Sequence, residues 1–186
     1  VLVTPAPERL LPTVRSRCQH VRLKPLSDEH LAQWLEASSL DMDDHTRQTA
    51  LEFAQGAPGM VDLVVRRNLT SWFDQLAPLM RVLDDGGWPE DVGDRMATCI
   101  EDWSQRGIDE NPKPSKDAAN REGAEMLMRI LGDHLRGRIA AHVEDPHTCA
   151  TVCRRVDHVA TAEAQVHAGL NLKHVLEGMA ARWSVA

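Results

Sequence analysis

Aromatic residues are scarce in this sequence, which has five Trp, two Phe and no Tyr among 186 residues. Most of the buried core must therefore come from aliphatic side chains and Met, which suits packed helices. No uninterrupted apolar run approaches the roughly 18 residues that a membrane-spanning helix needs, so we expect no membrane contact. Cysteine is also sparse, with four residues in no dense framework. This favours a reducing compartment, and we expect a cytoplasmic protein.

The sequence also lacks two motifs that mark common enzyme active sites. The sequence contains no phosphate-binding loop of the form Gly-x-x-x-x-Gly-Lys-Ser/Thr and no Gly-x-Ser-x-Gly elbow. Negative charge gathers toward the C-terminus: residues 1–68 have eight Lys/Arg against nine Asp/Glu, and residues 69–186 have thirteen against nineteen. Because an acidic surface binds nucleic-acid phosphates poorly, we expect any DNA contact to involve another part of the protein or another subunit.

Helical patterns dominate from residue 27 onward. Ser27 is a good N-cap with acidic residues behind it, and further helices are predicted from near Asp43 or Asp44 to Gly56 and from Met60 to Asn68. Later helices are predicted at about 70–85, 89–107, 118–142, 146–168 and 171–183, with a loop over 108–117. We expect Thr70-Ser71 and Asp145 to cap two of these helices, and Asp84-Asp85 to be an ordinary helix end. The sequence thus predicts an all-α protein, with a three-helix module at 22–68 and a bundle of about five helices at 69–186.

The first residues have a different pattern. Val1–Thr4 form a short β-branched apolar run that stops at Pro5, which predicts a buried strand. A strand alone cannot pair its own backbone groups. We therefore expect residues 1–21 to be the remnant strand and connector of a domain that precedes this chain.

One segment carries a specific resemblance. Residues 11–18 read Leu-Pro-Thr-Val-Arg-Ser-Arg-Cys, which resembles a signature near the end of the ATPase domain in bacterial clamp-loader subunits of the AAA+ superfamily. In that family a three-helix lid and then a helical collar follow, in the order predicted here. Asn171-Leu172, leading into Val175-Leu176-Glu177, resembles the last collar helix. The close match covers about 15 residues, and the looser match in architecture covers the whole chain.

The resemblance implies a role for Arg17. In clamp loaders the Arg of the Ser-Arg-Cys motif reaches the γ-phosphate of ATP bound by a neighbouring subunit, as a trans-acting arginine finger. A guanidinium suits this role because it is always charged and donates in a planar fork. Ser16 and Cys18 are then expected to hold the turn, with Cys18 packed as a small apolar group. The alternative is that Arg15 and Arg17 are ordinary surface charges of a connector.

Met60 indicates which kind of family member this chain resembles. ATP-binding members carry a nucleotide-sensing Arg at the start of the third lid helix, where this sequence has Met60 after Gly56-Ala57-Pro58-Gly59. A thioether cannot pair with a phosphate, and Arg66 and Arg67 lie about two turns later. The resemblance therefore implies a non-hydrolysing subunit that binds no cofactor itself, while neighbouring subunits bind ATP. Thr4 lies where the first nucleotide sensor of active members sits, and we expect it to be structural here.

The resemblance to clamp-loader subunits implies a subunit of the clamp loader of the DNA polymerase III holoenzyme in DNA replication. Such an assembly uses ATP to load the sliding clamp on primed DNA. The collar is expected to bind other clamp-loader subunits, and clamp and DNA contacts are expected to run through the assembled complex.

The sequence allows two other interpretations, a zinc site and a free-standing helical module. Four residues of types that bind zinc lie within twelve positions: His147, Cys149, Cys153 and His158. They fall on a predicted helix, on which His158 points about a quarter turn away from Cys153. We therefore expect no metal site. A free-standing helical interaction or oligomerisation module without a role in ATP hydrolysis would explain the bundle but not residues 11–18. The tryptophans are expected to be core anchors: Trp34, Trp72, Trp88, Trp103 and Trp183.

Overall fold

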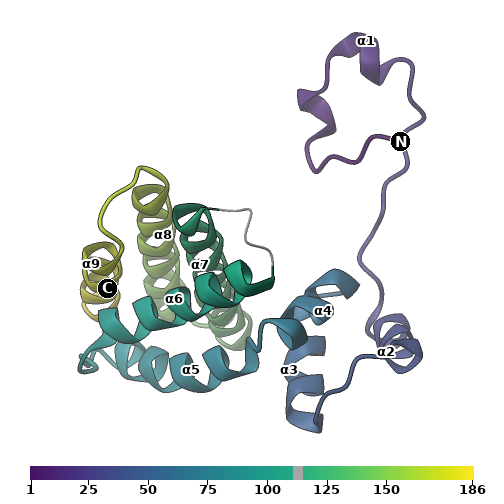
Figure 1. Ribbon diagram of the computed structural model, residues 1–186. Coiled ribbons are helices and arrows are strands. Elements are labelled where there is room, and N and C mark those ends of the chain that lie inside the picture. Colours follow the sequence, from purple (N-terminus) through teal and green to yellow (C-terminus); the bar gives the residue numbers. More distant parts are fainter. Residues whose placement is uncertain (111–114) are drawn as a thin grey trace.

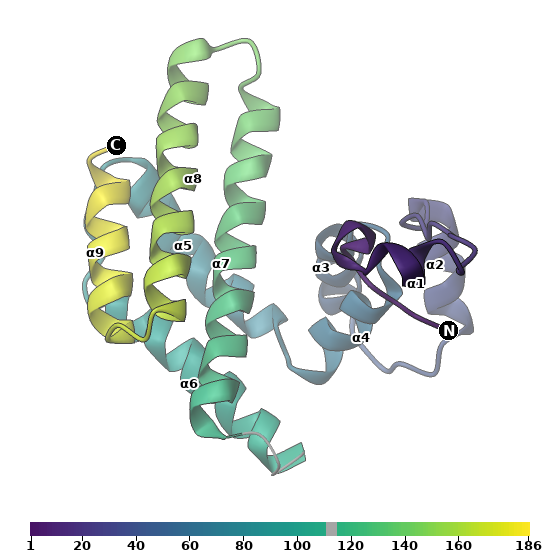
Figure 2. The same cartoon turned by 90° about the horizontal axis from the view of Figure 1, so that it is seen from above.

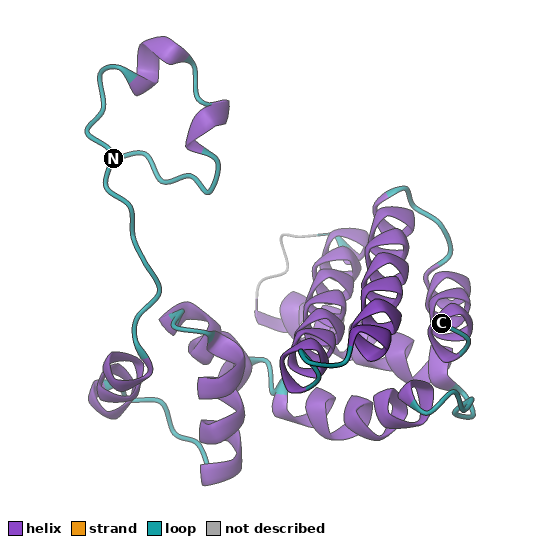
Figure 3. Cartoon of the chain, turned by 180° about the vertical axis from the view of Figure 1, so that it is seen from behind, coloured by secondary structure: helices purple, strands orange, loops and turns teal. Residues whose placement is uncertain are grey.

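The computed structural model describes residues 1–110 and 115–186, and within these residues it contains helices and loops but no strand (Figures 1 and 3). The predicted all-α class is confirmed. A 3-10 turn, η1 (Pro7–Arg9), and a single helical turn, α1 (Pro12–Arg15), precede the longer helices. These are α2 (Asp28–Ala37), α3 (Asp44–Ala54), α4 (Pro58–Arg66), α5 (Thr70–Asp84), α6 (Val92–Glu110), α7 (Lys116–Ala141), α8 (Pro146–His167) and α9 (Leu172–Ser184).

The strand predicted at Val1–Thr4 is not formed. These residues have no regular secondary structure, and the Leu2 side chain is 62% exposed. The physical reason is that the described residues offer no second strand with which this segment could exchange backbone hydrogen bonds. Residues 1–26 form an exposed N-terminal segment that extends away from the remaining helices (Figure 1).

Helices α2, α3 and α4 pack on one another. The predicted cap at Ser27 is confirmed, since its hydroxyl accepts from the His30 amide at 3.3 Å. The helix predicted to start near Asp43 or Asp44 begins at Asp44, and Asp43 Oδ1 caps it by accepting from the Thr46 amide at 2.8 Å. Each cap satisfies a backbone donor that the first helical turn leaves unpaired. The core of this group includes Leu31, Leu35, Ala50, Phe53, Val61 and Val64.

Helices α5–α9 form a bundle. The long helices α7 and α8 lie side by side, α9 lies along α8, and α6 packs against both α7 and α9 (Figure 2). The predicted cap at Asp145, followed by Pro146, is confirmed at the start of α8. Fully buried residues of the bundle include Leu76, Leu83, Met96, Ile100, Leu127, Leu131, Leu176 and Trp183. The apolar core is continuous from α2 to α9, with α5 touching α3.

Several local predictions are wrong. Helix α5 begins at Thr70, whose hydroxyl is buried against Thr46, so Thr70 is not the cap. Helix α6 begins at Val92 rather than Pro89 and continues through Gly107, where the absence of a Cβ leaves room for the Arg67 guanidinium. Of the predicted loop over 108–117, residues 108–110 belong to α6 and 116–117 to α7, while 111–114 lie outside the described residues.

The tryptophans divide into two groups. Trp72, Trp103 and Trp183 are buried as predicted, and Trp34 packs at the edge of the core. Trp88 is 52% exposed, so the core prediction is wrong for it. Within residues 1–110 and 115–186, none of the helices combines the length and apolarity needed to cross a membrane.

Candidate functional site

The signature segment folds as a closed turn at the end of α1. The Ser16 hydroxyl donates to the Thr13 carbonyl at 3.3 Å, the Arg17 amide to the Val14 carbonyl at 3.1 Å, and the Cys18 amide to the Arg15 carbonyl at 3.3 Å. Proline at the first position of α1 starts the turn because its ring fixes φ near the helical value. This turn fixes the backbone from which the Arg17 side chain extends.

Arg15 and Arg17, the two arginines of this segment, are both exposed, and neither forms a salt bridge with any residue that the structure describes. From Arg9 to Lys24 the chain has five Arg/Lys residues and no Asp/Glu. A guanidinium left in this state keeps all its donors for a phosphate or carboxylate outside the chain.

Cys18 departs from its predicted environment. It is exposed, whereas we expected it to pack as a small apolar group. The cause is the same as for Val1–Thr4: no described element covers this side of the turn. Thr4 is held locally, with its hydroxyl accepting from the Ala6 amide at 3.1 Å.

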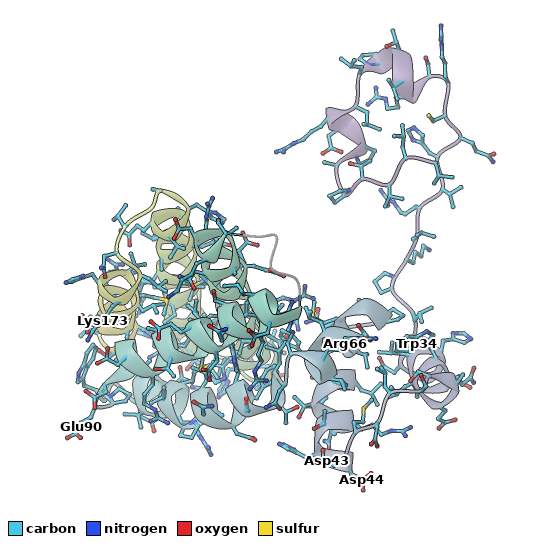
Figure 4. The ribbon with its side chains drawn as sticks, viewed as in Figure 1. Trp34, Asp43, Asp44, Arg66, Glu90 and Lys173 are labelled. Carbon is cyan, nitrogen blue, oxygen red and sulfur yellow. The ribbon has the colours of Figure 1, made fainter. Side chains whose placement is uncertain are left out.

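Met60 lies in the first turn of α4, where its side chain is half-buried against the core. Arg66 is at the C-terminal end of the same helix, and its Nε donates to Asp62 Oδ1 at 2.7 Å (Figure 4). The Arg67 guanidinium lies 5.1 Å from the centre of the Trp103 ring. The structure therefore does not bring either arginine to the position of Met60. Nor does it bring Arg17 there, since α1 stands apart from α4 (Figure 1).

The four residues considered for zinc lie on α8. The Cys149 thiol is 3.2 Å from the His142 carbonyl oxygen, and Cys153 is exposed. No group of three or more His, Cys, Asp or Glu side chains with a metal-binding arrangement is found among the described residues. Elsewhere, burial raises the pKa of the Cys99 thiol to about 11, with Asp102 adding to the shift.

A buried polar cluster in the bundle was not predicted from the sequence. Asp84, the last residue of α5, is 4% exposed in its side chain and receives donors from three other helices. Its Oδ1 accepts from Arg155 Nη1 at 2.9 Å and from the Trp183 indole nitrogen at 3.0 Å. Its Oδ2 lies 2.8 Å from His134 Nε2 and 3.6 Å from Arg138 Nε. We call these five residues the Asp84 cluster.

Arg155 is the most buried cation of this cluster, with a side chain 5% exposed. Beyond its bond to the carboxylate, its Nε donates to the Trp183 carbonyl at 3.2 Å and its Nη2 to the Asp84 carbonyl at 3.0 Å. These bonds supply donors to carbonyls at the ends of α5 and α9, where helices run short of backbone donors, although the Trp183 carbonyl also accepts from the Ala186 amide at 3.4 Å. Arg155 therefore ties the ends of two helices to the middle of α8.

Burial and the neighbouring opposite charges shift the pKa values of Asp84 and Arg155 in opposite directions. Burial alone would raise the pKa of Asp84, but hydrogen bonds from His134 and Trp183 and the charges of His134 and Arg138 outweigh it and lower that pKa. Burial lowers the pKa of Arg155, with Arg138 and Arg154 adding to the effect and Asp84 and Asp85 opposing it. Asp84 is thus held as a carboxylate by the cationic and hydrogen-bonding side chains around it.

The surface cavities include one in each helical group. The first, of about 600 Å³, lies between α2 and α3 and is lined by Asp28, Leu31, Asp44, Arg47, Gln48, Leu51, Glu52 and Gln55. The second, of about 190 Å³, adjoins the Asp84 cluster and is lined by Asp84, Arg138, His147, Thr148, Thr151, Val152 and Arg155. Carboxylates outnumber arginines in the walls of the first cavity, whereas two arginines accompany one carboxylate in the second.

Comparison with known proteins adds no relative: no family model, no curated protein and no solved structure matches this chain.

Proposed function

We propose that this chain contributes the lid and collar of a delta-prime-type subunit in the clamp loader of a bacterial DNA polymerase III holoenzyme. The observation that carries the proposal is the eight-residue run Leu11–Cys18, followed by a three-helix group and then a five-helix bundle. In this role α2–α4 form the lid and α5–α9 the collar. The subunit supports ATP-dependent loading of the sliding clamp on primed DNA and hydrolyses no ATP itself.

In this proposal Arg17 is the residue that takes part in ATP hydrolysis, at the site of a neighbouring subunit. Its exposure and its lack of a salt bridge within the described residues support a role toward a phosphate held by a neighbouring subunit. Its charge would stabilise the negative charge that develops on the γ-phosphoryl oxygens during transfer. Met60, with a thioether where a nucleotide-sensing Arg would lie, supports the absence of nucleotide sensing by this chain.

The collar role rests on the bundle. Helices α5–α9 hold a large apolar core and the Asp84 cluster, which makes them a rigid support suited to hold a subunit in a ring. Exposed apolar residues on the bundle include Val82, Trp88, Val143, Val156, Leu170 and Val185. Exposed apolar side chains are what a subunit interface buries.

The test is reconstitution. The protein that contains this sequence is mixed with ATP-binding clamp-loader subunits and the sliding clamp, and assembly is followed by gel filtration and by clamp loading on primed circular DNA. We expect co-elution with the other subunits and clamp loading that depends on this protein. A stable oligomer of the protein alone, without affinity for those subunits, would overturn the proposal and favour a free-standing oligomerisation module.

A further inference from the structure

The cavity beside the Asp84 cluster contains more positive charge than its own residues neutralise. Arg138 and Arg155 both line it, and the carboxylate that faces them is Asp84 alone. Both Asp84 oxygens already have close hydrogen-bond partners, Oδ1 in Arg155 and Trp183 and Oδ2 in His134, while Arg138 Nε lies farther off at 3.6 Å. Two guanidinium groups therefore line the cavity with one carboxylate, whose oxygens are engaged by donors closer than Arg138.

Donors remain unused at the same place. Arg138 Nε is buried and has no hydrogen-bond partner among the described residues, because its nearest acceptor, Asp84 Oδ2, is 3.6 Å away. Arg155 uses three of the five N–H groups that a guanidinium carries. The Thr151 hydroxyl accepts from Arg154 Nη2 at 2.8 Å, which leaves its own hydrogen available. A buried donor without an acceptor is costly, so an acceptor at this position would stabilise the fold.

The acidic residues nearby do not supply that acceptor. Asp145 caps α8, and its two oxygens accept from the His147 and Thr148 amides and from the Thr148 hydroxyl. The first-turn amides of α8 are thereby occupied, so the helix end itself offers no further donors. Asp85 acts on Arg155 only through its charge and does not line the cavity.

We propose that this cavity binds a small tetrahedral oxyanion of the phosphate or sulfate class, held by Arg138, Arg155 and Thr151. The volume of about 190 Å³ corresponds to about six waters at roughly 30 Å³ each, which is enough for such an anion and part of its hydration. Arg138, with a side chain 36% exposed, stands at the opening, and Arg155 forms the inner wall. A guanidinium fork matches the oxygens of a tetrahedral anion. This site is independent of the proposed function.

The test measures inorganic phosphate binding by isothermal titration calorimetry at constant ionic strength, with chloride as the comparison salt. We expect saturable one-to-one binding to the wild-type chain and a loss of affinity of about tenfold or more in Arg138→Gln, since hydrogen bonds to charged groups have about this effect. Arg136→Gln is the matched control. It removes the same charge two residues away on α7, where Arg136 pairs with Asp133 and Gln55 outside the cavity, and it should bind phosphate like the wild type.

Equal losses in the two variants would overturn the proposal, because they would show an effect of net charge alone. Absence of saturable phosphate binding to the wild type would overturn it as well. A second measurement does not depend on any variant: in NMR spectra of the wild-type chain, phosphate should shift the side-chain Nε–H signals of Arg138 and Arg155 while that of Arg136 stays in place. Unchanged Arg138 and Arg155 signals at a phosphate concentration that saturates any heat signal would contradict the site.

Discussion

Arginines of this chain lie in two contrasting environments. In the N-terminal segment, Arg17 is exposed on a single turn of helix, and no residue that the structure describes forms an ion pair with it. In the bundle, Arg155 is almost fully buried and holds a carboxylate and two backbone carbonyls. The same side chain therefore has opposite consequences. Where the fold satisfies the guanidinium, the residue stabilises the bundle, and where it does not, the residue remains available to a partner.

The largest effect that tests this contrast is expected at Arg155. Arg155→Ala leaves Asp84 buried without its closest arginine and removes a donor from the carbonyls of Asp84 and Trp183, so we expect a loss of about 3–5 kcal/mol in the free energy of unfolding. Urea denaturation followed by circular dichroism measures it. The control is Arg47→Ala, which breaks the exposed pair with Glu36 at 3.4 Å and should cost at most about 1 kcal/mol. Similar losses for both variants would remove the contrast.

A second effect is expected where the N-terminal segment joins the helices. Gly56 has φ +80°, its carbonyl accepts from the Leu26 amide at 2.8 Å, and a Cβ there would lie 2.3 Å from the Leu26 carbonyl oxygen. We expect Gly56→Ala to destabilise the protein by about 1–3 kcal/mol, from backbone strain and the displaced contact.

The matched control for that junction is Gly59→Ala. A Cβ at Gly59 meets no atom within 4 Å, and this residue lies inside α4, where Ala is favoured over Gly by up to about 1 kcal/mol. The temperature of thermal unfolding should therefore be lower than that of the wild type for Gly56→Ala and higher for Gly59→Ala. If Gly56→Ala unfolds at the wild-type temperature, the junction is not held as described.

A smaller loss of stability, which grows gradually as the pH falls, is expected in acid. Because the pKa of Asp84 is lowered in the folded protein, its contribution to stability is complete above the ordinary Asp pKa of about 3.9 and is lost as the pH falls through the lowered value. The difference in unfolding free energy between neutral and acidic solution should thus be smaller in Asp84→Asn than in the wild type. Equal differences in the two proteins would show that Asp84 does not contribute in this way.

The smallest effect on stability is expected at Arg17. Arg17→Ala removes an exposed side chain that has no salt bridge in the described residues, so the free energy of unfolding should change by less than about 0.5 kcal/mol. The same urea titration checks this. A loss comparable to that of Arg155→Ala would mean that Arg17 serves the fold of this chain.

Local sequence patterns predicted much of the helical part. Ser27, Asp43 and Asp145 marked helix starts correctly because an N-cap acts on amides only two or three residues away. The strand at Val1–Thr4 failed for the opposite reason, since a strand depends on a neighbour that the described residues do not contain. The helix end predicted at Gly107 is wrong, since this glycine lies inside α6 and leaves room for the Arg67 side chain, a contact between residues far apart in the sequence.

The Asp84 cluster could not be assembled from sequence because its members lie on four different helices. Asp84 itself was interpreted as an ordinary helix end. One signal was available: a carboxylate in the last turn of a helix opposes the helix dipole, so Asp84 at the end of α5 calls for a compensating cation. Only the packing of the bundle shows that Arg155, Arg138 and His134 supply the compensating positive charge.

The proposed function is tested most directly by the DNA-stimulated ATPase rate of a reconstituted clamp loader that contains Arg17→Ala, compared with one that contains Arg22→Ala, a second exposed Arg of the same segment. We expect that both proteins assemble normally, that Arg22→Ala keeps the wild-type rate, and that Arg17→Ala loses the share of the rate that comes from the adjacent ATP site. Equal rates for the two assemblies would contradict the role assigned to Arg17.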